Sequence, residues 1–469
     1  MNEHSFVRPR DRHRYASGSD NANWYWSCTE HRDNSSNVWA VRFSDGDDNW
    51  NDKDNNRLSC RPCRVEGADD PLSDPFHSQN NGEGIKKMMT DDGPTIEAVF
   101  NAYFDCRKAK RNSINQLRFE IDLETNLVEL HRQLCNGSYK IGRSVAFIVT
   151  HPKIREVWAA DFRDRVVHHV ICNAISDRYY RRFIRDNYAC IPGRGTHDGL
   201  RRISGFARSI TQNWTKSAYF LKADVANFFN SIDHQILIDL AERRVTEEWI
   251  RVLIRQVVLH DPRTNFSMRS SRASFERVPR HKSLLHAPLG KGLPIGNLTS
   301  QFFANLYMDE LDQYAKHVLK ARYYGRYVDD VVILDEDPDI LNMWYEQMDE
   351  FIKSKLAIHL HPNKRHLNLV DRGIDFTGFI IKPGRTYLRQ TSLSKCQQKI
   401  RSWERKGSPV DNETLKDVSQ SLNSYLGMLR QVDGYNVRKS ICQRVGSLFL
   451  QTDAKYTKTR CGAGKAVKV

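Results

Sequence analysis

Three aspartates stand where apolar runs of the sequence end, far apart along the chain. Asp224 follows the apolar stretch 217–223, and Asp329 and Asp330 lie between Val328 and the apolar run 331–334. β-Branched and aromatic neighbours favour strands, so the pattern predicts a strand that ends at Asp224 and a hairpin with the acidic pair in its turn. An acidic pair by itself is also the ordinary composition of a β-turn.

Acidic side chains gathered in this way can hold divalent cations. Adjacent carboxylates repel each other, and removing them from water is costly without a counter-charge. Mg²⁺ prefers carboxylate, water and phosphate oxygens, and two such ions about 3.5–4 Å apart can activate a hydroxyl and stabilise the leaving group of a phosphoryl transfer. We therefore expect the three acids to meet in space and to hold two Mg²⁺ ions for nucleotidyl transfer.

The net charge of +15 is unevenly distributed over the 469 residues. Residues 1–75 hold 10 basic and 14 acidic side chains, whereas the rest of the chain holds 62 basic and 43 acidic ones. A surplus of this size favours a partner with a phosphate backbone. A basic but inert surface is the alternative.

The elements expected around these acids change in type along the chain. Residues 1–64 are rich in Asn, Asp and Trp, and residues 65–94 have the composition of a linker. From about residue 95 apolar residues recur at helical spacing, then short apolar strands alternate with helices, and the pattern is helical again beyond Thr391. This order predicts a mixed α+β fold.

Nothing in the composition suggests a membrane or an oxidising compartment. No apolar run approaches the ~20 residues that span a bilayer, and residues 1–18 lack the apolar core of a secretory signal. The ten cysteines are expected to be buried thiols. We expect a cytoplasmic protein without a membrane partner.

Seven short segments, in order along the chain, are similar to the motifs of reverse transcriptases. They are HPKIR (151–155), DFRDRVVHH (161–169), YACIPGRGTH (188–197), the strand that ends at Asp224, GLPIGNLTSQ (292–301), the YVDD hairpin (327–330) and GIDFTGF (373–379). The chain from about 95 to 450 resembles the reverse transcriptases of diversity-generating retroelements, within the RNA-directed DNA polymerases that include group II intron and retron enzymes.

The resemblance implies a fold and an activity. The fold would be an α+β right-hand polymerase, with fingers over 95–215, a palm of antiparallel sheet and helices over 216–385 that carries the catalytic site, and an α-helical thumb over 386–453. A basic disordered tail would follow over 454–469. The activity would be RNA-directed synthesis of DNA, with template RNA, primer, cDNA product and deoxynucleoside triphosphates as partners.

The resemblance also implies roles for individual residues. Asp224, Asp329 and Asp330 would be the catalytic acids, and the backbone carbonyl of Val225 would be a further metal ligand. Phe229 would exclude a 2′-hydroxyl, although core packing is an alternative for it. The set around the incoming nucleotide would be Lys153, Arg155, Arg165, Phe229, Ile295, Gly296 and Gln301, with a structural role as the alternative for Arg165. The set around primer and template would be Tyr327, Gly378, Lys395 and Lys399.

Ile295 departs from the pattern of many reverse transcriptases, which carry Gln at this place. The segment Ile-Gly-x-x-x-Ser-Gln over 295–301 resembles the diversity-generating class, which misincorporates opposite template adenines. We therefore expect Ile295 and Arg155 to influence fidelity, and by analogy we expect a small basic accessory variability protein as a partner. Another reverse transcriptase class, of intron or antiphage type, and a non-catalytic nucleic-acid-binding scaffold are the alternatives.

Two further regions leave alternatives open. Residues 1–64 resemble the end of a C-type-lectin-like variable region, which favours a translated template repeat or a partner-binding fragment; a zinc site at Cys28, Cys60 and Cys63 lacks a fourth ligand. Residues 263–282, with six basic residues and one acid, predict either a phosphate-tracking insertion or a disordered loop.

Overall fold

The computed structural model describes residues 5–7, 24–27, 41–43, 89–90, 93–108, 113–150, 153–406, 412–445 and 450–461. The chain divides into two compact units, of which the first is 1–81 with 111–114 and the second is 82–110 with 115–469. In the first unit, β1 (Ser5–Val7), β2 (Trp24–Ser27) and β3 (Val41–Phe43) form an antiparallel sheet with β2 in the middle. The remainder of residues 1–64, including the three candidate zinc cysteines, lies outside the described residues.

Helices open the second unit. After the short hairpin of β4 (Met89–Thr90) and β5 (Gly93–Pro94), α2 (Ile96–Lys108), α3 (Ile114–Glu120), α4 (Leu123–Cys135) and α5 (Phe162–Tyr180) follow. The predicted apolar face of α4 is buried, with Leu123, Leu127, Leu130 and Leu134 each at most 8% exposed. The side chain of Asp161 caps α5 by accepting a hydrogen bond from Arg163 N at 3.1 Å.

The second unit also contains a small sheet with the strand order β7-β6-β9. β6 (Ser144–Val149) pairs antiparallel with β7 (Arg155–Ala159) and parallel with β9 (Phe266–Met268). The basic region 263–282 belongs to a folded insertion that includes η2 (Pro262–Thr264), α10 (Arg272–Glu276), η3 (Arg280–Lys282) and η4 (Leu284–His286). The insertion is anchored by the buried Glu156 carboxylate, which accepts hydrogen bonds from Ser283 Oγ and from Leu284 N, the latter at 2.9 Å.

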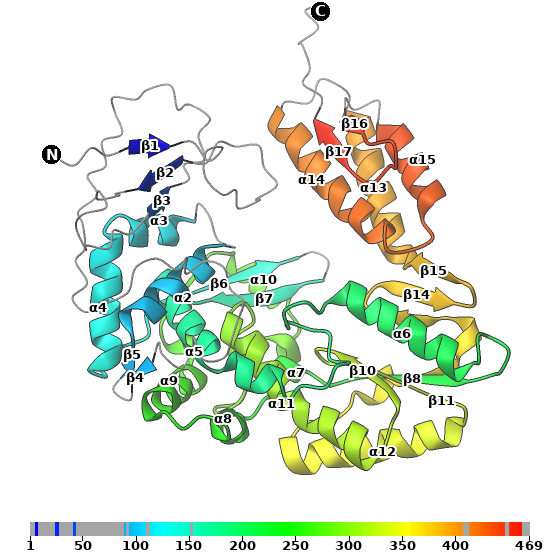
Figure 1. Ribbon diagram of the computed structural model, residues 1–469, viewed down its shortest axis with the longest axis horizontal. Helices are drawn as coiled ribbons and strands as arrows, with labels where there is room; N and C mark the ends of the chain where they lie inside the picture. The colour runs from blue at the N-terminus through cyan, green and yellow to red at the C-terminus, as the bar shows by residue number, and fades with distance from the viewer. Residues whose placement is uncertain are drawn as a thin grey trace, which may run out of the picture. The chain divides into compact units, whose positions relative to one another are not determined.

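The central sheet has the strand order β10-β11-β8-β12, with every pair antiparallel. Its strands are β8 (Tyr219–Asp224), β10 (Tyr323–Tyr327), β11 (Asp330–Asp335) and β12 (His366–Leu369). Helix α6 (Thr196–Ile210) lies on one side of these strands and α12 (Pro338–Leu356) on the other (Figure 1). The helices α7 (Phe228–Ser231), α8 (His234–Glu242), α9 (Glu248–Leu259) and α11 (Leu298–Gln313), with η5 (Tyr314–Val318), connect β8 to β10.

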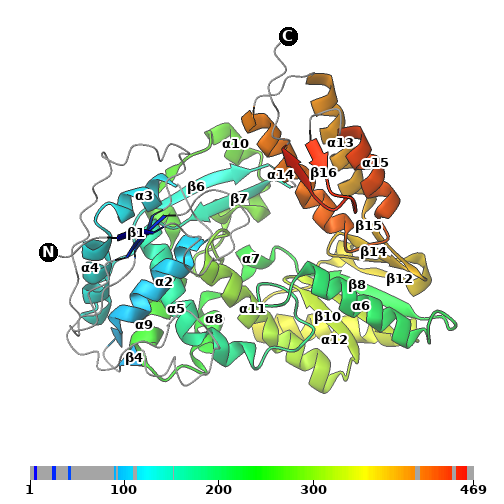
Figure 2. The same cartoon turned by 45° about the horizontal axis from the view of Figure 1, so that its top comes forward.

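Beyond the central sheet, η6 (Pro362–Lys364) and η7 (Val370–Arg372) flank β12, and a second antiparallel sheet contains β13 (Ile374–Phe376), β14 (Phe379–Lys382) and β15 (Arg385–Leu388). Three helices follow, α13 (Gln390–Lys406), α14 (Asn412–Leu429) and α15 (Tyr435–Val445), as Figure 2 shows. One hydrophobic cluster joins them to the central sheet, because Phe220, Val332 and Leu334 pack in the same core as Ile400 and Leu422.

The last described strands correct one prediction. β16 (Leu450–Thr452) pairs antiparallel with β17 (Thr459–Cys461), and Thr459 O accepts a hydrogen bond from Asn423 Nδ2 of α14 at 2.9 Å. The predicted disorder of the tail 454–469 is therefore wrong as far as Cys461, because the backbone there is paired and held on a helix. Residues 462–469 lie outside the described residues.

The mixed α+β class predicted from the sequence is confirmed. Among the described residues, none of the helices has the length and apolar character that crossing a bilayer would require.

Candidate functional site

The central sheet brings the three predicted acids together. β8 ends at Asp224, β11 begins at Asp330, and the two residues are direct partners in the antiparallel register. Asp329 lies in the turn just before Asp330, and the carboxylate of Asp224 is near enough to contribute to the raised pKa of Asp329. Residues more than a hundred positions apart in the chain therefore form one acidic cluster at the end of the two strands.

The turn that carries Asp329 has an unusual backbone. Tyr327 pairs with Asp330, so Val328 and Asp329 form a two-residue turn. Val328 has φ +56°, a left-handed conformation that is rare for a β-branched residue, and Asp329 does not share it. Positive φ at the first position alone fits a type II′ turn, which suits the twist of a hairpin but normally carries glycine there.

Two acids of the cluster, Asp329 and Asp330, are desolvated. Burial raises the pKa of Asp329 to about 7, with further contributions from the charges of Asp224 and Asp330. Burial also raises the pKa of Asp330, although Lys222, whose Nζ lies 3.5 Å from Asp330 Oδ2, opposes this. A carboxylate whose neighbours are carboxylates favours a proton or a cation. The cluster thus has the electrostatic character of a cation site.

Lys364 is a residue of this site that the sequence did not reveal. Its ammonium contacts Asp224 Oδ2, and its side chain is 53% exposed. The contact depends on the segment 359–361, which lies antiparallel to the segment 224–226. Ala226 N donates to His359 O at 3.0 Å, and His361 N donates to Asp224 O at 2.7 Å. In the sequence Lys364 is one of 72 basic residues and follows an ordinary Pro-Asn turn, so no local signal marked it.

The oxygen donors of the acidic cluster suit a hard divalent cation, but they are not arranged as a complete coordination shell. Within the residues that the structure describes, no group of three or more His, Cys, Asp or Glu side chains is arranged to hold a metal. Asp224 and Asp329 approach each other while Asp330 lies beside Lys222. The carbonyl oxygen of Val225 is used by neither hydrogen bond to the segment 359–361 and can serve as a fourth oxygen donor. Carboxylate and carbonyl oxygens are the ligands that Mg²⁺ prefers.

Comparison with known proteins assigns this part of the chain. Residues 151–381, just under half of the sequence, match the family model described as reverse transcriptase (RNA-dependent DNA polymerase). These residues are a reverse transcriptase domain. The acidic cluster lies inside the match, and the match indicates an RNA-directed DNA polymerase, a class of enzyme that uses divalent metal ions.

Two individual proteins also resemble the chain. An uncharacterised 91 kDa protein in the cob intron of Schizosaccharomyces pombe is 24% identical over 161 residues, which is 34% of this chain and only 17% of that protein. The structure of telomerase from Candida albicans, in complex with a TWJ fragment of telomeric RNA, aligns with a TM-score of 0.37 at 11% identity, over 66% of this chain and 62% of that chain. A score at that level is too low to bear on function.

The segment 292–301 of the reverse transcriptase domain connects α7, which follows Asp224, to β7. Leu293 N donates at 2.8 Å to the carbonyl oxygen of Phe229, a residue five positions after Asp224. Trp158 N donates to Ile295 O at 2.8 Å. Gly296 has φ +130°, and a Cβ atom there would lie 2.8 Å from Val157 Cγ1. Glycine is therefore required for this close approach. Phe228 is buried and Phe229 half-buried, so the second of the pair is the one that reaches solvent.

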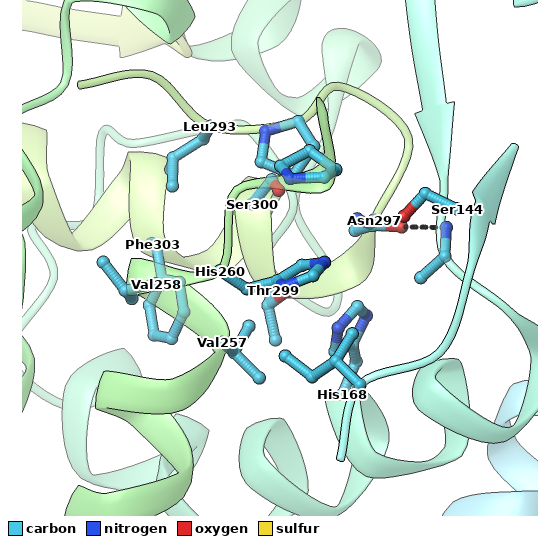
Figure 3. Close-up of a pocket in the computed structure, with 14 residues that line it drawn as sticks. Ser144, His168, Val257, Val258, His260, Leu293, Asn297, Thr299, Ser300 and Phe303 are labelled. Atoms are coloured by element: carbon cyan, nitrogen blue, oxygen red, sulfur yellow. Dashed lines mark hydrogen bonds between the residues drawn. The ribbon is translucent and has the colours of Figure 1, made fainter. Parts of the chain in front are cut away.

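A small cavity lies behind this segment, lined by polar side chains that include His168, His260, Asn297 and Ser300 (Figure 3). Asn297 Oδ1 accepts a hydrogen bond from Ala160 N at 3.1 Å. The volume of about 20 Å³ has room for a water molecule but not for a nucleotide. This cavity is therefore too small to be the nucleotide site.

The basic residues expected at the nucleotide lie in two different settings. Lys153 and Arg155 are exposed at the turn between β6 and β7. Arg165 is partly buried on α5 and donates from Nε to Ala160 O at 2.8 Å, so its side chain fixes the end of β7. This hydrogen bond supports the structural alternative for Arg165, whereas the Arg155 side chain is exposed at the start of β7. Gln301, at the start of α11, accepts a hydrogen bond from Cys190 Sγ at 3.6 Å.

The residues expected at primer and template come from two regions. Gly378 has φ +93° and Thr377 φ +49°, so the turn between β13 and β14 is of type I′. Tyr327, half-buried, packs against the cluster that joins the central sheet to the C-terminal helices. Lys395 and Lys399 are exposed on α13, where Lys399 Nζ donates to Ser421 Oγ at 3.0 Å.

Proposed function

We propose that the whole chain acts as an RNA-directed DNA polymerase that copies an RNA template into DNA. The observation that carries the proposal is the meeting of Asp224, Asp329 and Asp330 within a domain that matches the reverse transcriptase family. The excess of basic residues beyond residue 75 supports template RNA, primer and cDNA as partners.

The parts of a right-hand polymerase are proposed over the ranges expected from the sequence. The palm, 216–385, would contain the central sheet and the β13–β14–β15 sheet. The fingers, 95–215, would contain the N-terminal helices with β6 and β7, and the thumb, 386–453, would contain the helices α13 to α15. The insertion 262–291 would extend the fingers sheet, because β9 pairs with β6.

The chemistry of the proposed site follows from its donors. Asp224, Asp329 and the Val225 carbonyl would hold divalent cations, with Asp330 completing the cluster; two Mg²⁺ ions there would supply an activated primer hydroxyl and a stabilised pyrophosphate leaving group. The half-exposed Phe229 would bar a 2′-hydroxyl. Arg155 and Lys153 would bind the triphosphate, since a guanidinium can contact phosphate oxygens bidentately.

Primer extension on an RNA template tests the proposal. The wild-type chain should extend a DNA primer in the presence of Mg²⁺, and Asp329→Asn should not. Arg178→Gln removes an ion pair far from the acidic cluster in sequence and serves as the matched control, which should retain activity. A wild-type chain that binds RNA and primer but never extends it would favour the non-catalytic scaffold.

We further propose that the enzyme belongs to the diversity-generating class and produces adenine-mutagenised cDNA. The apolar Ile295, whose carbonyl is fixed to Trp158 N, supports this finer assignment together with the Ser300-Gln301 pair. Sequencing the cDNA made by wild type and by Ile295→Gln tests it. Errors at template adenines should fall in the variant, and an unchanged adenine error rate would contradict the role of Ile295.

An intron-type reverse transcriptase is the second candidate. The observation that favours it is the 24% identity to a protein in a cob intron. Faithful copying of adenines by the wild-type enzyme would support this candidate over the diversity-generating class.

A further inference from the structure

We propose that Arg326, held by Asp312, is a positioning residue that keeps Val328 in its left-handed conformation and thereby aims Asp329 at Asp224. The proposal rests on the polymerase function proposed above. It assigns a role to the residue before the YVDD turn and to a residue of α11, neither of which touches the acidic cluster.

The ion pair is fully buried and bidentate. Both side chains are 0% exposed. Arg326 Nη2 lies 2.6 Å from Asp312 Oδ2, and Arg326 Nε lies 2.7 Å from Asp312 Oδ1. Tyr324 Oη also donates to Asp312 Oδ1, at 2.7 Å. Two parallel hydrogen bonds fix the plane of the guanidinium as well as its position.

The third nitrogen of the same guanidinium reaches the turn. Arg326 Nη1 donates to the carbonyl oxygen of Val328 at 2.7 Å and lies 3.4 Å from Asn305 Oδ1. The backbone of Arg326 is held as well, since Arg326 N donates to Asp186 O and Tyr188 N donates to Arg326 O, both at 2.9 Å. The donor that faces the Val328 carbonyl is therefore immobile on both its backbone and its side-chain ends.

This hydrogen bond acts at the point where the turn is strained. The carbonyl of Val328 belongs to the peptide between Val328 and Asp329, so its orientation sets the direction in which Asp329 leaves the turn. A β-branched residue at positive φ raises the free energy of the fold. Such strain persists only where the surroundings over-determine it, and the guanidinium supplies a charge-assisted hydrogen bond for that purpose.

Stability alone does not account for the pair. Burying two opposite charges is costly, and replacing them by neutral groups of similar volume is often neutral or stabilising. A second Arg–Asp pair on the same helix gives the comparison: Asp309 is bound by Arg182, and these two side chains are 4% and 28% exposed. Arg182, which lies just after the end of α5, donates to Asp309 and Glu310 of α11 rather than to the turn, so the two pairs share their chemistry but not their link to Asp329.

The test is a mutant cycle on primer extension. Arg326→Gln/Asp312→Asn removes the pair without leaving a buried charge, and Val328→Gly supplies a residue that adopts positive φ without strain. The double variant should lose about 100-fold in kcat, as expected for a misplaced catalytic group, with little change in the KM for nucleotide. When Val328→Gly is also present, the double substitution should lower kcat by no more than about 10-fold relative to Val328→Gly alone. At least about 10-fold of the loss would then be restored.

Arg182→Gln/Asp309→Asn is the matched control and should change kcat by no more than about 3-fold at a comparable loss of melting temperature. An equal kcat loss in the control, or no rescue by Val328→Gly, would overturn the positioning role. Where the double variant does not fold, Arg326→Lys takes its place, because one ammonium cannot keep both the bidentate pair and the Val328 hydrogen bond.

A crystal structure of Arg326→Gln/Asp312→Asn, in which Val328 is unchanged, separates this inference from the proposed function. Val328 should leave the left-handed region even when the wild type proves inactive in primer extension. A Val328 that keeps φ near its wild-type value would contradict the inference, whatever the activity.

Discussion

Asp329 of the central sheet and two acids of the surrounding helices, Glu247 and Asp198, are held in opposite ways. Asp329 lies among carboxylates, and burial with its acidic neighbours raises its pKa to about 7. Glu247, at the start of α9, is hydrogen-bonded by the Arg178 guanidinium of α5, which lowers its pKa to about 2. Asp198 on α6 is likewise bound by Arg185, and its pKa is lowered.

The difference separates stability from function. An acid that has a fixed arginine is most stable ionised, so it contributes to the folded state near neutral pH. Asp329 and Asp330 of the sheet are buried beside other carboxylates, and the pKa of each is raised, so the ionised form of both is disfavoured. Glu247 and Asp198 thus stabilise the fold as ionised partners of arginines, whereas Asp329 and Asp330 are the acids whose charge a bound cation would stabilise.

The largest expected effect removes one sheet acid. Asp224→Asn or Asp329→Asn should lower primer extension by about 10³-fold or more, because the negative charge that binds the catalytic cations is lost. For Asp329→Asn the melting temperature in the absence of divalent ions should stay the same or rise, since a desolvated charge is removed. Thermal melts and extension assays on the same preparations check both halves. A large fall in melting temperature would show that this acid, too, is structural.

The second prediction concerns divalent cations. Mg²⁺ at about 100 times its dissociation constant should stabilise the wild type by about 2.7 kcal/mol, because it binds the folded state. Chelation with EDTA should reverse the shift. Asp329→Asn should lose the response, whereas Glu247→Gln should keep it. An equal Mg²⁺ response in both variants would place the cation elsewhere.

The third prediction extends the comparison to basic residues. Lys399 is bound to the Ser421 hydroxyl and lies 6.0 Å from the Tyr425 ring centroid, so a phosphate can compete for it. Lys395→Ala/Lys399→Ala should weaken primer–template binding by about 10-fold at moderate salt and lower the salt slope of log Kd by about 2. Fluorescence anisotropy at several salt concentrations measures both. An unchanged slope would remove these lysines from the nucleic-acid interface.

The smallest prediction concerns the pH dependence of a helix pair. Since the pKa of Glu247 is lower in the folded state than its ordinary value of 4.5, the pair stabilises the fold above about pH 4.5 and loses this contribution as the pH falls towards 2. Because the pair is partly exposed, the contribution should be no more than about 1 kcal/mol. The free energies of unfolding of wild type and Glu247→Gln, from urea melts, should differ at pH 6, and the difference should shrink as the pH falls towards 2. A constant difference would refute the pairing.

Much of the site was predictable because its signals are local. The apolar runs around Asp224 and Asp329 predict strands that end in acids, and the apolar faces of α4 and α14 predict buried helices, which the structure confirms. The β16–β17 hairpin was missed because its short polar strands have no periodicity, and their pairing depends on contacts with α14. The folded insertion around residues 263–282 was not predicted as such, because it is held by contacts distant in sequence, among them the hydrogen bonds of Ser283 and Leu284 to Glu156, more than a hundred residues away, and the pairing of β9 with β6.

The sequence by itself determined which residues could do chemistry, because acids at the ends of apolar strands and glycines in turns are local features with local causes. Only the tertiary structure decided how those acids are held. Lys364 reaches Asp224, and Asp312 fixes Arg326 behind the turn, through contacts between segments that have no sequence relation to each other. Charge balance in a buried site is set by whichever groups the fold brings within a few ångströms, and the order of residues along the chain does not encode that directly.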